Sequence, residues 1–126
     1  MTLTDFLLAR IAADETAAKN VVEGDYSEGR WHWDLHRGHP YRSALVNDRG
    51  AVVLPPKNDD VYPSAAVAEH IARHDPARVL AECEAKRRIV ETATGQHASS
   101  DEGYEMMRII ATVYADHEDY DESWRP

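Results

Sequence analysis

Histidines give this sequence its clearest potential for chemistry. Two of the seven histidines, His70 and His74, are four residues apart, so on a helix both imidazoles lie on one face. Such a pair can bind one zinc ion if further ligands come from elsewhere. Position 71, directly after the first His, holds Ile instead of the Glu that a metallopeptidase helix uses as its base. The alternative is structural, with His70 at the core edge and His74 stabilising the helix C-terminus.

A second group of histidines lies in the segment RWHWDLHRGHP, residues 30–40. On a strand His32 and His36 share a face but are about 13 Å apart, too far to ligate one ion. Only a reversal of the chain would bring His36 and His39 together. We interpret this row as the solvated face of a hairpin, with Trp31 on the other face as a core anchor. The zinc hypothesis therefore uses His70, His74, His36 and His39 as metal ligands, with His97 or His117 as further ligands.

No catalytic constellation accompanies the histidines. The sequence contains no Gly-x-Ser-x-Gly, no Gly-rich phosphate loop and no paired Cys motif. Cys83 is the only cysteine, which excludes a disulfide within the chain and favours a reducing cytoplasm; its helix position indicates a small core residue. We predict no catalytic residue and no cofactor, with zinc as the alternative.

The charge of the chain restricts its partners. With 23 acidic and 14 basic residues the net charge is −9, which repels phosphate backbones and anionic membranes and argues against nucleic acid. No apolar run approaches the roughly 20 residues that span a bilayer, and the start, MTLTDFLLAR, does not read as a secretory signal. We expect a protein partner, with a host protein among the candidates. A homo-oligomer and a DNA mimic stay open.

The hydrophobic pattern predicts one α+β domain over residues 1–126, dominated by helices. The last helix should be the most buried, because its apolar residues cover more than one narrow stripe. The first helix should end in EGDYSEG, and NDRG should form a tight reversal between two strands. The expected elements are helices at about 4–21, 64–74, 76–93 and 101–116, strands at about 31–36, 43–46 and 51–54, and a tail at 117–126.

A helix junction is predicted at His74-Asp75-Pro76. Asp is a good N-cap, and Pro fits the first helical position while disfavouring helix in the residue before it. We expect Asp75 to accept a backbone N–H from the first turn of the helix that starts at Pro76. The role of both residues would then be architectural.

Aromatic and acidic residues alternate in the C-terminal tail. Docked, Tyr120 and Trp124 would fasten the terminus across the helices, because such side chains bury large areas. Free, they would form a partner-binding peptide with Trp124 as its anchor. The sequence leaves both alternatives open.

Two motifs together resemble a known family: AEHIARHDPARVLAECEAKRRIVE at 68–91 and YADHEDYDESWRP at 114–126. They are similar to the actinobacterial and actinophage domain-of-unknown-function family numbered 6221, and GRW at 29–31 extends the resemblance loosely over the chain. The sequence departs from the family at Glu118 and Arg30, where Pro is usual. A more distant similarity, to Ead-type accessory proteins of lambdoid phages, implies architecture only.

The charge, the missing catalytic groups and the resemblance lead to one expectation about function. We expect a small acidic cytoplasmic accessory protein of phage or prophage type that acts by protein binding. The alternative is a zinc-binding domain or zinc-dependent enzyme that uses His70 and His74.

Overall fold

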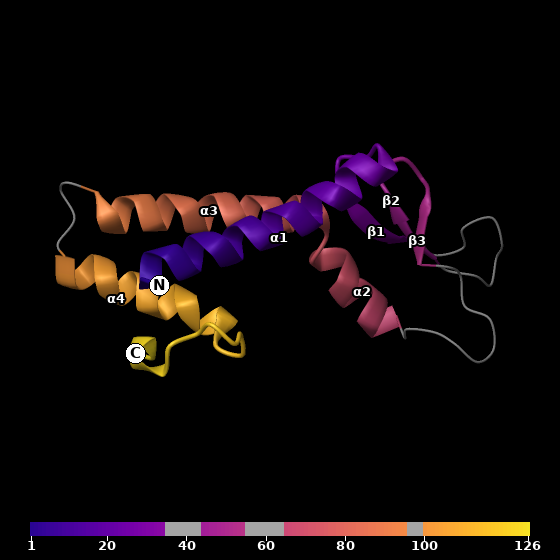
Figure 1. The fold of residues 1–126 in the computed structure, drawn as a ribbon. Coiled ribbons are helices and arrows are strands. Elements are labelled where there is room, and N and C mark those ends of the chain that lie inside the picture. Colours follow the sequence, from indigo (N-terminus) through magenta and orange to yellow (C-terminus); the bar gives the residue numbers. More distant parts are fainter. Residues whose placement is uncertain (35–43, 55–64, 96–99) are drawn as a thin grey trace. The chain divides into compact units, whose positions relative to one another are not determined.

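The computed structural model describes residues 1–34, 44–54, 65–95 and 100–126. Within these residues four α-helices and a three-stranded antiparallel sheet confirm the helix-dominated α+β class. In chain order the elements are α1 (Leu3–Asp25), β1 (Trp31–Asp34), β2 (Ala44–Asn47), β3 (Val52–Leu54), α2 (Ala65–Arg73), α3 (Pro76–Thr94), α4 (Ser100–Ala111) and two 3₁₀ helices, η1 (Thr112–Tyr114) and η2 (Glu122–Trp124) (Figure 1).

The chain divides into two compact units. We call residues 1–16 with 81–126 the helical unit, and residues 17–80 the sheet unit. Helices α1 and α3 each contribute to both units. The description of 1–126 as one domain stays a prediction.

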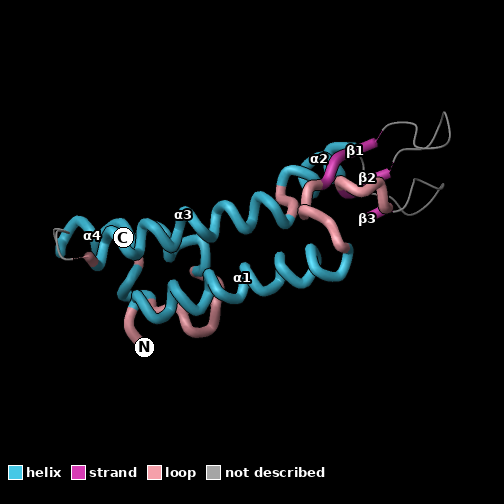
Figure 2. Tube along the Cα trace, turned by 90° about the horizontal axis from the view of Figure 1, so that it is seen from above, coloured by secondary structure: helices cyan, strands magenta, loops and turns pink. Residues whose placement is uncertain are grey.

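The helical unit packs the first part of α1 against α3 and α4 (Figure 2). Thr2 and Asp5 cap the start of helix α1, since the Asp5 N–H donates to Thr2 Oγ1 (3.1 Å) and the Thr2 N–H to the Asp5 carboxylate (3.3 Å). A Cβ at Gly103 of α4 would lie 2.4 Å from the Ala93 carbonyl oxygen of α3, so this close approach requires glycine. The buried core side chains of the unit are Leu3, Phe6, Leu7, Ile11, Cys83, Val90, Ala93, Met107, Ala111, Tyr120 and Trp124.

The C-terminal tail is docked onto the helical unit. Trp124 and Tyr120 are only 7% and 9% exposed, and their ring centroids lie 5.1 and 5.9 Å from that of the fully buried Phe6. Arg108 of α4 holds the tail backbone, because its Nε donates to the Trp124 carbonyl oxygen (3.1 Å) and a terminal nitrogen to that of Arg125. The structure therefore shows the docked alternative, and it leaves neither ring exposed as an anchor for a partner.

The sheet unit is built on an antiparallel sheet in the order β1-β2-β3. All four residues of the central strand β2 are buried, whereas in β1 His32 is exposed and Trp31, Trp33 and Asp34 are half-buried. The NDRG reversal is confirmed, because the buried Asn47 side chain accepts the N–H groups of Arg49 and Ala51, each at 3.0 Å. Gly50 completes the turn with φ of +78°.

The junction between α2 and α3 forms as predicted. Asp75 Oδ1 accepts the backbone N–H of Arg78 (2.9 Å), which caps the helix that starts at the buried Pro76. Its second oxygen, Oδ2, accepts the backbone N–H of Trp31 at the start of β1 (3.0 Å). The Ala77 N–H donates to the carbonyl oxygen of Gly29, which is also next to β1 (3.0 Å). Asp75 thus joins the first turn of α3 to the sheet.

Element ends differ from the expectations in a few places. Helix α1 continues past residue 21 through Gly24 to Asp25. It ends inside EGDYSEG because Tyr26, with φ of +49°, adopts the left-handed conformation and Ser27 N–H donates to the Val22 carbonyl oxygen (3.2 Å). Helix α4 gives way to η1 after Ala111, earlier than the predicted end. The expected end of the first strand at 36, the expected start of the second strand at 43 and the expected start of the second helix at 64 lie outside the described residues.

Candidate functional site

An exposed apolar groove lies between α3 and α4 of the helical unit. Its lining residues are Ile89 of α3 and Met106, Ile109 and Ile110 of α4, around a volume of about 190 Å³. Ile109 is 55% exposed, Met106 40% and Ile89 37%. Contiguous large apolar side chains left in water often mark interaction sites, whereas scattered ones do not. The groove is therefore the strongest candidate binding site in the described part of the chain.

The sequence of α4 explains how the groove forms. Met106, Ile109, Ile110 and Val113 have the i, i+3, i+4, i+7 spacing of one helix face, while the neighbouring face, about 100° around the helix, packs inward through Met107. We expected all of these residues to face inward and α4 to be the most buried helix. The structure differs, because the core of the helical unit covers only the Met107 face. The broad apolar pattern signalled two faces, one of which stays exposed.

Acidic side chains flank the groove on α4. Glu102 lies one helical turn before Met106 and Glu105 one turn before Ile109, and both glutamates are exposed. Arg108, the nearest cation on α4, is engaged with Glu105 (2.7 Å) and with the tail backbone. Together with the net charge of −9, this edge favours a partner that carries basic side chains beside apolar ones.

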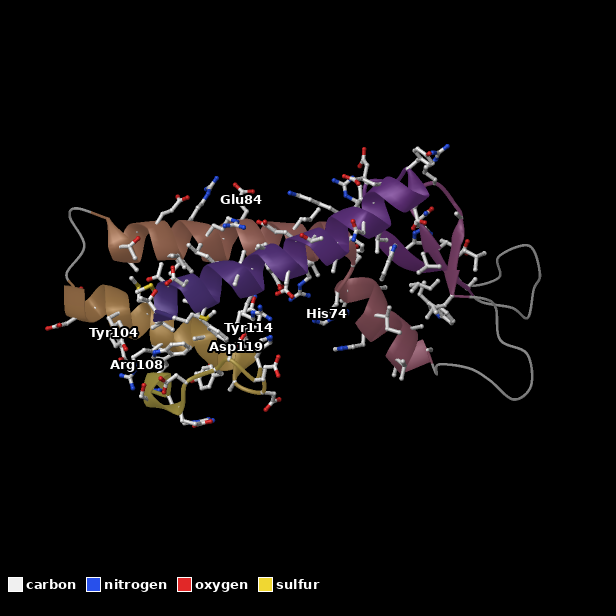
Figure 3. All side chains as sticks on the ribbon, viewed as in Figure 1. His74, Glu84, Tyr104, Arg108, Tyr114 and Asp119 are labelled. Carbon is white, nitrogen blue, oxygen red and sulfur yellow. The ribbon has the colours of Figure 1, made fainter. Side chains whose placement is uncertain are left out.

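A part-buried polar network lies deeper in the helical unit. Lys86 Nζ donates to the Tyr114 hydroxyl (3.0 Å), which donates to Asp14 Oδ2 (2.8 Å); Figure 3 labels Tyr114. Burial, with the hydrogen bond to Asp14, raises the pKa of Tyr114, so this phenol stays protonated. Arg87 forms two hydrogen bonds of 2.8 Å to Glu15. These polar groups form hydrogen bonds to one another, so the network supports the packing of α1, α3 and η1.

Cys83 is buried beside this network. It is 1% exposed, and its Sγ lies 3.8 Å from the carbonyl oxygen of Ile11. Burial raises the pKa of the Cys83 thiol, which disfavours the reactive thiolate. The interpretation of Cys83 as a core residue is confirmed.

The histidine pair singled out in the sequence does lie together. The rings of His70 and His74 have centroids 4.4 Å apart, and both residues are exposed. His74 Nδ1 donates to the His70 carbonyl oxygen (2.8 Å), so its Nε2 is the nitrogen left for a ligand. In the ranges that the structure describes, no three His, Cys, Asp or Glu side chains gather to hold a metal ion. Of the other candidate ligands, His36, His39 and His97 lie outside those ranges, and His117 contacts Arg10 in the helical unit.

We expect untagged protein to retain less than about a tenth of an equivalent of zinc after incubation and gel filtration, because two imidazoles supply only part of a four-ligand site. Elemental analysis measures the content, and the melting temperature should not rise with added zinc. One equivalent of bound zinc that is lost in His70→Gln and His74→Gln, but kept in His32→Gln, would contradict this expectation and establish the zinc alternative.

The fold and the groove define a small helix-dominated α+β protein whose candidate site is an apolar interaction surface. The chain belongs to the family of unknown function DUF6221, whose model matches residues 1–126, as the two motifs predicted. No curated protein and no solved structure matches the chain. None of the helices in the described ranges is long and apolar enough to cross a membrane.

Proposed function

We propose that this protein acts by binding another protein, without catalysis, and that the partner places an amphipathic helix in the groove between α3 and α4. The observation that carries the proposal is the exposed row Met106, Ile109 and Val113 beside Ile89. Val113, at 65% exposure, extends the row past the end of α4. Covering these side chains would remove from water apolar surface that the chain itself leaves open.

The chemistry of the partner follows from the edges of the groove. A helix with apolar side chains at i, i+3 or i+4 and i+7 presents a stripe that fits between two helices. Lysines or arginines beside that stripe would face Glu102 and Glu105 on α4 and would be attracted by the net charge of −9. The proposed ligand is therefore a basic amphipathic helix of a protein partner.

The biological setting is part of the same proposal. The single buried cysteine suits a reducing cytoplasm. The resemblance to small accessory proteins of phages suggests an accessory role in a phage or prophage, with a host protein as the partner.

A model peptide tests the groove directly. We expect Ile109→Lys to weaken binding of a labelled leucine–lysine amphipathic helix by about tenfold or more, because the new charge sits in the groove and repels the lysines. Ile109 is 55% exposed, so its replacement should leave the core intact. Fluorescence anisotropy at physiological ionic strength measures the affinities.

Val52→Lys is the matched control, since Val52 in β3 is also an exposed apolar residue, at 49%, and the net charge changes equally. This variant should bind like the wild type, and a scrambled peptide of the same composition should bind weakly to all three proteins. Equal binding of the peptide to Ile109→Lys and to the wild type, or no binding to the wild type, would show that the groove is not the site.

A further inference from the structure

The outward face of α3 is exposed along its length in the helical unit. Ala81, Ala85 and Ile89 follow one another at intervals of four residues, which places them in one row, and all three are exposed. A shallow groove of about 240 Å³ lies along this row, lined by Ala81, Glu84, Ala85 and Arg88. The side chains at the centre of the face are small enough for another helix to approach closely.

The charges that flank this row reverse their sign at Ala85. Glu82 and Glu84 come before Ala85, and Lys86 and Arg88 come after it at the same distances along the chain. Glu84 and Arg88 are exposed, with 65% and 74% of their side-chain surface accessible, and they form an ion pair of 2.7 Å within the helix. Figure 3 shows the Glu84 side chain pointing outward from α3, away from α4.

We propose that this face binds a second copy of the chain, with the two α3 helices antiparallel about a two-fold axis at Ala85. Ala81 of each copy then lies opposite Ile89 of the other, so a large side chain meets a small one. Glu84 and Arg88 are four residues apart and lie on the same flank of the row. In an antiparallel two-fold pair this flank meets the same flank of the other copy, so Glu84 lies beside Arg88 of the second copy, and the symmetry makes this pair twice. The ion pair inside each helix is exchanged for one between the helices.

The charge pattern selects both the occupant and its direction. A two-fold interface needs a patch that is complementary to itself, and a reversal of charge about a central residue meets this condition only for antiparallel helices. In a parallel, in-register pair like charges would meet. Glu82 would face Glu84 of the other copy, and Lys86 would face Arg88 of the other copy. Lys86 is already hydrogen-bonded to Tyr114, so Glu84 and Arg88 carry the pairing.

Two charge reversals test the self-association, which goes beyond the partner binding proposed above. The wild-type chain of 14.2 kDa should sediment as a dimer of about 28 kDa, twice that mass. Glu84→Arg alone and Arg88→Glu alone should each be monomeric at concentrations where the wild type is dimeric, since like charges then face each other at both pairs. An equimolar mixture of the two variants should form a heterodimer, because each reversed residue meets an opposite charge. Analytical ultracentrifugation and native mass spectrometry measure these states.

The controls separate this interface from net charge and from the groove between α3 and α4, with which the interface shares Ile89. Glu84→Arg changes the net charge from −9 to −7, so it would strengthen association if overall repulsion were decisive. Glu69→Arg on α2, in the sheet unit, makes the same change in charge and should stay dimeric, as should Ile109→Lys. A monomeric wild type up to millimolar concentration, single variants that remain dimers, or a mixture that does not associate would each overturn the proposal.

Discussion

Replacing Trp124 with alanine should lower the free energy of unfolding by about 3–5 kcal/mol, the usual cost of removing a large buried aromatic side chain. Trp124 is 7% exposed, and its ring contacts the rings of Phe6 and Tyr120, with centroids 5.1 and 5.8 Å away. The truncation leaves a cavity against Phe6 and loosens the tail that Arg108 holds. Urea denaturation followed by circular dichroism measures the change.

Val113→Ala is the control for this measurement. Val113 is 65% exposed near the end of α4, so its truncation should change the stability by no more than about 0.5 kcal/mol. If the tail were free and served as a recognition peptide, Trp124→Ala would leave the stability unchanged and would abolish binding of the partner. That outcome would contradict the docking of the tail.

Replacing Asp75 with alanine should cost about 2–3 kcal/mol of stability, because one carboxylate makes two separate hydrogen bonds. The Arg78 N–H loses its cap at the first turn of α3, and the Trp31 N–H loses its acceptor at the start of β1. Thermal denaturation of both proteins under identical conditions measures the difference.

Asp75→Asn is the matched variant, since it keeps the shape of the side chain but only one acceptor oxygen. It should recover about half of the lost stability, because Asn is as good an N-cap as Asp. Unchanged stability in Asp75→Ala, together with loss of a metal or a partner, would show that the junction is a binding site and not an architectural element.

Local signals allowed much of the fold to be predicted from the sequence. The cap at Asp75 and the turn at NDRG each depend on residues within four positions of one another. Side-chain to backbone hydrogen bonds at this range form wherever the chain has these residues in this order. Helix and strand positions could also be predicted, because the periodicity of apolar residues is a local signal. The end of α1 was predicted less accurately, because Tyr26 in the left-handed conformation, and not a glycine, ends this helix.

The tertiary structure decided which predicted faces are covered. Periodicity shows that Met106, Ile109 and Val113 share a face of α4 and its continuation, but it cannot show whether another element packs against that face. The acceptor role of Asp75 toward Trp31 joins residues that are 44 positions apart, and the tail reaches Phe6 from the far end of the chain. Covering a face depends on long-range packing, whose competing arrangements differ by small net free energies. The sequence alone therefore determined the elements and their caps, and the packing determined the exposed groove and the docked tail.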